Sequence, residues 1–129
     1  MGYYSQFDIE TKPMMDEETE KKAVIDLWKI YDPKNEYRYQ EILNSEAGNS
    51  KSTFWYFCME PMKWYEMKED MTALSKLYPD YLFKVNRNGE ESCDFSDDYF
   101  KNGRHQHCVG TLTYEKPDLN YLYGGEKHE

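Results

Sequence analysis

Residues 60–104 most strongly constrain the fold of this chain, because they join one amphipathic helical pattern to strand-like sequence through a proline. The apolar residues of the helical pattern are Trp64, Met67, Met71, Leu74 and Tyr78. Their spacing predicts a helix of about four turns that starts at Pro61 and buries one face. Pro79 ends this helix because the residue before a proline is disfavoured in helical backbone. Residues 81–85 then have strand composition, and we expect alternate side chains to face the core.

An acidic segment follows this predicted strand and lies between two Asn-Gly pairs. The pairs, at residues 88–89 and 102–103, are both typical of two-residue hairpin turns. Residues 90–100 between them contain five carboxylates and no basic side chain. We therefore predict an acidic connection that leads into a hairpin, with aromatic side chains spaced among the carboxylates.

The N-terminal part of the chain predicts a strand followed by a helix. Phe7 and Ile9 alternate with polar residues and are expected to point inward from a strand that Pro13 closes. Asp16 is the predicted N-cap of the helix, and the glutamates after it favour the positive end of the helix dipole. The predicted buried face consists of Ala23, Val24, Leu27, Trp28 and Tyr31. The Asp-Pro pair at residues 32–33 ends this helix.

The middle of the chain is less clearly patterned. Residues 37–43 fit either a short helix or an extended segment, and residues 47–52 have the composition of a flexible connection. Residues 53–59 form a continuous apolar run with strand composition, and we predict a strand in the centre of the sheet there. Residues 104–114 alternate in polarity and predict the last strand.

The resulting element order, β-α-β-α-β-β-β, predicts an α+β fold. We expect an antiparallel or mixed sheet of about five strands with two helices packed on one face. The helical crossovers are similar to the split βαβ arrangement of ferredoxin-like folds. Residues 1–117 are predicted to form a single domain, and residues 118–129 a flexible C-terminal tail.

Charge and composition narrow the classes of partner. Sixteen basic against twenty-five acidic side chains give a net charge of −9, which disfavours direct binding to nucleic acid or anionic membranes. The same charge favours a basic partner, although an acidic surface can also serve solubility alone. Thirteen tyrosines and three tryptophans indicate a core built largely from aromatic side chains. Three cysteines without CxxC spacing fit reduced thiols, so we expect a cytoplasmic protein.

No sequence motif predicts catalysis. The chain has no phosphate-binding loop, dinucleotide-binding glycine pattern or nucleophile elbow, so we expect no enzymatic activity and no cofactor. His105 and His107 would share one face of the last strand and are weak candidates for metal ligands. Asp94, Asp97 or Asp98 could approach them across a hairpin. This alternative predicts a small-molecule or metal-binding domain that uses the two histidines and aromatic side chains.

One stretch of the chain resembles a protein family. The pattern W-Y-x-M-x-x-D-M-x-x-L-S-K-x-Y-P-D-Y-L-F, followed by N-G-E-E and Y-F-K-N-G-R, covers residues 64–104. It resembles small ferredoxin-like proteins of unknown function that are carried by phages and other mobile elements. Several anti-defence proteins of phages, CRISPR inhibitors among them, share this size and acidity. The resemblance therefore implies that class, in the cytoplasm of the host cell, and it carries over no catalytic residue.

The acidic segment is the predicted binding face. Its closely spaced carboxylates and aromatic rings could imitate a phosphate backbone that is presented to a basic channel. The predicted contact residues are Glu90, Glu91, Asp94, Asp97, Asp98, Tyr99 and Phe100. The expected function is inhibition of a host defence nuclease through occupation of its basic nucleic-acid-binding surface.

Overall fold

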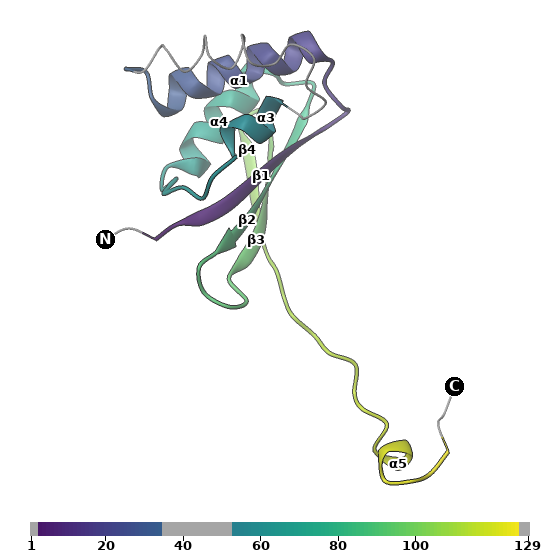
Figure 1. Ribbon diagram of the computed structural model, residues 1–129. Helices are drawn as coiled ribbons and strands as arrows, with labels where there is room; N and C mark the ends of the chain where they lie inside the picture. Colours follow the sequence, from purple (N-terminus) through teal and green to yellow (C-terminus); the bar gives the residue numbers. More distant parts are fainter. Residues whose placement is uncertain (1–2, 35–52, 127–129) are drawn as a thin grey trace.

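A computed structural model of the chain describes residues 3–34 and 53–126, so the segments predicted at residues 37–43 and 47–52 lie outside the described residues. The described part has an α+β fold with four antiparallel strands and helices on one side (Figure 1). Along the chain the elements are β1 (Ser5–Lys12), α1 (Glu17–Tyr31), α3 (Thr53–Phe57), α4 (Met67–Leu77), β2 (Leu82–Gly89), β3 (Phe95–Lys101), β4 (Arg104–Val109) and α5 (Leu119–Leu122).

The strands follow one another across the sheet in the order β1-β2-β3-β4, and each neighbouring pair is antiparallel. The chain leaves β1, passes through the helices, and returns as β2 directly beside β1. A ferredoxin-like sheet instead joins two parallel strands through each helix. The predicted α+β class is therefore confirmed, whereas the ferredoxin-like arrangement and the count of five strands are not.

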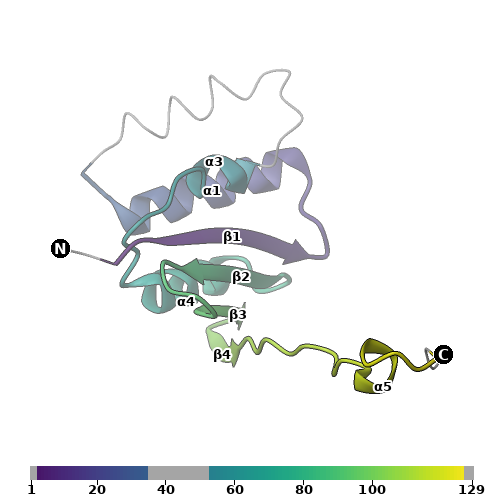
Figure 2. The same ribbon diagram turned by 60° about the horizontal axis from the view of Figure 1, so that its bottom comes forward.

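The helices α1, α3 and α4 lie on the same side of the sheet (Figures 1 and 2). α3 packs against β1, and α4 packs against β3 and β4. α1 contacts both of these helices. Its first turn begins as predicted, with the Thr19 N–H donating to the Asp16 carboxylate over 2.7 Å, and it ends at Tyr31 before the Asp-Pro pair.

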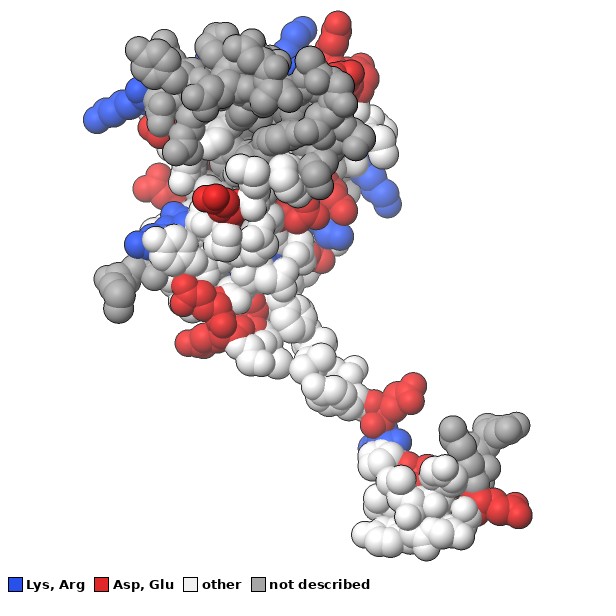
Figure 3. Space-filling view, in the orientation of Figure 1, with Lys and Arg blue, Asp and Glu red and all other residues white. Residues whose placement is uncertain are grey.

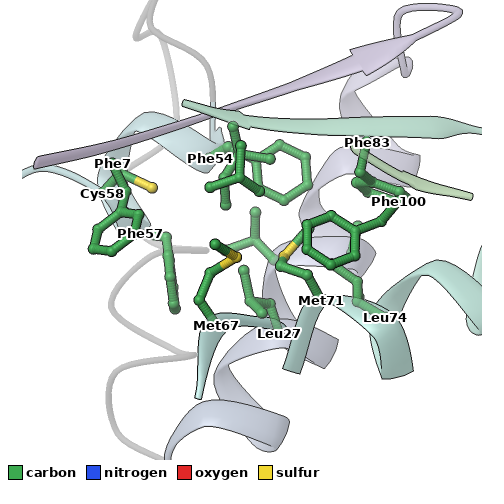
Figure 4. Close-up of a cluster of buried hydrophobic side chains, with 14 of the residues drawn as sticks. Phe7, Leu27, Phe54, Phe57, Cys58, Met67, Met71, Leu74, Phe83 and Phe100 are labelled. Atoms are coloured by element: carbon green, nitrogen blue, oxygen red, sulfur yellow. The ribbon is translucent and has the colours of Figure 1, made fainter. Parts of the chain in front are cut away.

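The core between the sheet and the helices consists largely of aromatic and methionine side chains (Figure 4). Phe83, Val85 and Phe100 from the sheet are fully buried, as are Met71 and Leu74 from α4. This confirms the helical stripe and the inward-facing positions predicted for the β2 segment. The same packing encloses Cys58, where burial raises the pKa of the thiol to about 12. That thiol is therefore protonated at neutral pH.

The prediction of a strand at residues 53–59 is wrong, because residues 53–57 of this run form the short helix α3. Phe54, Phe57 and Cys58 are buried, which is the i, i+3, i+4 spacing of a helix face. Trp55 and Met59 are exposed instead of buried. A continuous apolar run contains both the helical and the strand period, so polarity alone could not separate the two.

The helix predicted to begin at Pro61 begins later, at Met67. The backbone of Met62 is used in another way: it exchanges two hydrogen bonds with Ser5, of 2.9 and 3.0 Å. Through this bridge, Met62 pairs with the edge of β1 that faces away from β2. Residues 62–66 are therefore a connection that places Trp64 in the core before the helix starts.

Only one of the two predicted Asn-Gly turns exists. Asn102 and Gly103 have φ values of 48° and 83° and form the β3–β4 turn, as predicted. Gly89 is instead the last residue of β2 and pairs with Ser5. A Cβ atom on Gly89 would lie 2.1 Å from the Asp94 Oδ2 atom, so close approach explains this glycine. The chain turns at residues 90–94, where Cys93 has a φ of 65°.

The last strand is shorter than predicted and ends at Val109. The chain beyond it leaves the body of the molecule and includes the short helix α5 (Figure 1). Within the described residues, no helix is long and apolar enough to cross a membrane.

Neighbouring residues of β3 provide a test of which sheet face holds the core. Phe100→Ala removes a fully buried ring and is expected to lower the free energy of unfolding by about 3–5 kcal/mol. Tyr99→Ala alters the opposite face, where the side chain is half-buried, and is expected to cost ~1–2 kcal/mol. Urea denaturation of both variants measures the difference. Equal losses, or a larger loss for Tyr99→Ala, would reverse the assignment of the two faces.

Candidate interaction surface

The predicted acidic segment is divided between a turn and a strand. Residues 90–94 connect β2 to β3, and the Gly89 N–H closes this connection by donating to the Asp94 carbonyl over 2.7 Å. Figure 3 shows carboxylate atoms gathered at this end of the body. The remaining carboxylates of the segment belong to β3, where successive side chains point to opposite faces.

Asp94 is held inside a hydrogen-bonded cluster at the turn. The Arg87 guanidinium donates to both Asp94 oxygens, at 2.6 Å to Oδ1 and 3.3 Å to Oδ2. The Tyr3 hydroxyl also donates to Oδ2. The hydrogen bonds from Arg87 first, and then from Tyr3, hold the pKa of Asp94 below its usual range. Asp94 is thus paired within the chain, and it joins β2, the turn and the N-terminal segment.

Further contacts fix the N-terminal segment against the turn and against the connection before α4. The Tyr4 N–H donates to Glu90 Oε1 over 2.8 Å, and the Glu91 N–H donates to the Tyr3 hydroxyl over 3.0 Å. The Tyr3 N–H donates to the Tyr65 hydroxyl over 2.8 Å. We name these five residues, Tyr3, Tyr4, Tyr65, Glu90 and Glu91, the aromatic–acidic end.

The aromatic–acidic end exposes both ring surface and charge. Tyr4 and Tyr65 are 46% and 70% exposed, and Glu90 and Glu91 are also exposed. Lys63 lies at its margin, with the ammonium 4.8 Å from the centroid of the Tyr4 ring. Three separate parts of the chain therefore present amphipathic rings beside carboxylates on one surface.

The sequence predicts that the carboxylates and rings of β3 belong to the same surface, but they lie elsewhere. Asp97 and Tyr99 lie on the sheet face that points away from the helices, where Asp97 accepts a hydrogen bond of 2.9 Å from Asn86. Asp98 is 3% exposed on the opposite face, and Phe100 is in the core. Strand alternation turns Asp98 and Phe100 inward, so neither side chain is exposed for the contact predicted for it.

His105 and His107 share one face of β4, as expected, and both contact the buried Asp98. The distances are 2.6 Å from Asp98 Oδ1 to His105 Nε2 and 2.9 Å to His107 Nδ1. One ring nitrogen of each histidine is thus directed at the same carboxylate oxygen. The described residues contain no group of three or more side chains arranged to hold a metal ion.

A pocket that the sequence did not predict lies close to the aromatic–acidic end and shares Tyr65 with it. Its volume is about 320 Å³. The lining residues are Tyr31, Asp32, Lys63, Trp64, Tyr65, Glu66 and Asp70. They come from the end of α1, the connection before α4 and the first turn of α4. The α1 residues lie more than thirty positions before the others in the sequence. No local pattern connects segments so far apart.

Asp70 is the most buried carboxylate of this pocket, with 8% exposure. Its Oδ2 atom accepts a 2.8 Å hydrogen bond from the Trp64 indole N–H. Burial raises the pKa of Asp70 above its ordinary value, and the charges of Glu66 and Glu69 raise it further. The ionised form is therefore held in the folded protein at a cost in free energy.

No protein-family model, curated protein or solved structure matches this chain. The function must therefore be inferred from the geometry of the described residues.

Asp70→Asn tests the electrostatic cost within the pocket. The raised pKa means that the Asp70 carboxylate is less favourable in the folded than in the unfolded chain, because only folding removes it from water. The amide avoids this cost and can still accept the Trp64 hydrogen bond, so the variant is expected to unfold at higher urea concentration than the wild type. The gain should shrink as the pH falls through the raised folded pKa toward about 3.9, the unfolded value.

Asp16→Asn is the matched control, because the Thr19 N–H lowers the pKa of the Asp16 carboxylate. An amide there is not expected to raise stability at pH 7. A pH-independent gain, or a loss of stability in Asp70→Asn, would contradict the assignment of an unfavourable buried charge.

Proposed function

We propose that this protein is a binding protein that acts stoichiometrically on a basic partner through the aromatic–acidic end. The observation that carries the proposal is the exposure of Tyr4 and Tyr65 beside Glu90 and Glu91 on a surface fixed by hydrogen bonds. Tyrosine supplies large contact area and a hydrogen-bonding group, and it is enriched among residues that dominate binding energy. Carboxylates around such rings select a basic surface.

The surface is also prepared for binding before the partner arrives. Backbone hydrogen bonds from Tyr3 and Tyr4 hold the N-terminal segment in place, so less conformational entropy is lost on association. The net charge of −9 adds long-range attraction to a positively charged partner and speeds the encounter. Both effects favour a tight, salt-sensitive complex.

We base the partner class on the expected resemblance of residues 64–104 to small phage and mobile-element proteins. We propose a host defence nuclease, of the kind that CRISPR inhibitors block, as the partner. A nuclease carries a basic channel for nucleic acid, and an acidic protein that occupies this channel competes with the natural substrate. The protein would then act as a partial mimic of the phosphate backbone in the host cytoplasm.

This proposal changes the set of contact residues. Glu90 and Glu91 remain contacts, whereas Asp94 serves within the chain by pairing with Arg87. The alternative of a metal site at His105 and His107 stays a prediction: both rings contact Asp98, but the described residues form no group of three or more side chains arranged to hold a metal ion. Reversal of all the predicted charges would thus disturb the fold together with binding, and a test must be confined to the turn.

Glu90→Lys/Glu91→Lys is expected to weaken partner binding by roughly tenfold or more, equivalent to about 1.4 kcal/mol, because it places positive charge against a basic surface. The control, Glu17→Lys/Glu18→Lys, makes the same change of net charge in the first turn of α1, after the far end of β1. Each tagged protein is incubated with bacterial host lysate, and the recovered proteins are identified after washes with rising salt and with duplex DNA.

The proposal predicts one nucleic-acid-binding protein that is retained by the wild type and the control, lost with the turn variant, and displaced by DNA. Equal loss with both variants would show that only net charge matters, and full retention by the turn variant would reject the aromatic–acidic end as the contact surface. Recovery of no such protein by the wild type would reject the proposed function.

A further inference from the structure

The pocket at the junction of α1 and α4 combines negative charge with aromatic walls. Asp32, Glu66 and Asp70 supply three carboxylates, against the single cationic side chain of Lys63. The Lys63 ammonium is directed to the ring of Tyr4, a residue that does not line the pocket. The lining therefore has an excess of negative charge around a concave space.

The rings of this pocket are arranged around a corner. Tyr31 and Trp64 have centroids 6.1 Å apart and planes at 88°, and Tyr65 adds a third ring to the lining. Aromatic rings attract a cation placed over their faces, most strongly where water is excluded. Trp64 is only 5% exposed and packs edge-on with Tyr31, so the ring surface offered to a cation comes mainly from Tyr31 and Tyr65.

The Asp70 side chain gives the pocket a buried anionic group. It is 8% exposed, and Oδ2 accepts the indole hydrogen bond of Trp64. Within the described part of the chain no hydrogen bond is formed to Oδ1, so this oxygen has capacity for a ligand in the pocket. An ionised carboxylate at such a buried position is stabilised when a cation binds beside it.

The charges at the helix termini of this junction favour a positively charged ligand. The pocket includes Tyr31 and Asp32 at the C-terminal end of α1, where the helix dipole favours positive charge. The N-terminal end of α4 would favour an anion, but Glu66, Glu69 and Asp70 already place carboxylates there. The local field at the pocket is thus set by acidic side chains.

We propose that this pocket binds an organic ammonium group, held between the aromatic rings and the Asp70 carboxylate. The group can come from two sources: a free small amine such as choline, or the side chain of a lysine on a partner protein. The inference depends only on the pocket and does not require the proposed function of the aromatic–acidic end.

Binding can be followed through the Trp64 indole N–H, because this group donates to Asp70 inside the pocket. ¹H–¹⁵N correlation spectra are recorded while choline, N-acetyl-lysine methylamide or its trimethylated form is added. The neutral isostere of choline, 3,3-dimethylbutanol, tests whether the charge matters. A saturable shift for at least one cation is expected, with affinity about tenfold or more above that of the isostere. Preference for choline indicates a free amine, and preference for a lysine derivative indicates a partner side chain.

Asp70→Asn is expected to weaken binding of the cation by roughly tenfold or more, because it removes the buried charge and keeps an acceptor for Trp64. Glu18→Gln is the control: it removes an exposed carboxylate from the first turn of α1, at the opposite end of that helix from the pocket. Glu66→Gln, at an exposed lining position, is a second test that does not alter the core.

The proposal is overturned if no cation gives a saturable shift, if the neutral isostere binds equally well, or if inorganic phosphate gives the shift instead. Unchanged affinity in both the Asp70 and the Glu66 variant would also overturn it. Saturable cation binding without a recovered nuclease would reject the proposed function and support the cation site in the pocket. A recovered nuclease without saturable cation binding would support the proposed function and reject the cation site.

Discussion

The packing of Trp64 is the interaction on which the rest of this structure depends. The centroid of its ring lies 5.3 Å from the ring centroid of Phe7 in β1, 5.1 Å from that of Phe57 in α3 and 6.1 Å from that of Tyr31 in α1, all in edge-on contacts. Its indole N–H donates to Asp70 of α4. One side chain thus joins the sheet to the three helices that cover it. Such buried aromatic contacts stabilise a fold beyond the area that they remove from water.

The position of Trp64 also determines what the surface presents. The bridge between Met62 and Ser5 fixes the connection on one side of the tryptophan, and α4 begins on the other. Tyr65, next in sequence, then reaches the backbone of Tyr3 and shares in both the pocket and the aromatic–acidic end. The core and the proposed binding surfaces therefore meet in one connection of five residues, 62–66.

Sequence patterns predicted those features that depend on local periodicity. The stripe that includes Met71 is predictable because a polar helix face contrasts with it. The β3–β4 turn is predictable because an Asn-Gly pair favours the positive φ values that Asn102 and Gly103 adopt. The helix α3 was missed because its apolar run has no polar contrast. The sequence places Asp98 on the surface because a run of carboxylates hides the alternation of a strand. The pocket depends on contacts between distant segments, which no local spacing encodes.

The hydrogen exchange of the Trp64 indole N–H tests this central role most directly. If Trp64 joins the sheet to the helices, its indole should exchange only when the whole domain unfolds, about 10³-fold or more slowly than in N-acetyl-tryptophanamide. The rate can be followed by NMR after transfer of the native protein into D₂O. Exchange at a rate close to that of the indole in N-acetyl-tryptophanamide would show that residues 62–66 open independently of the domain, and would contradict the role assigned to Trp64.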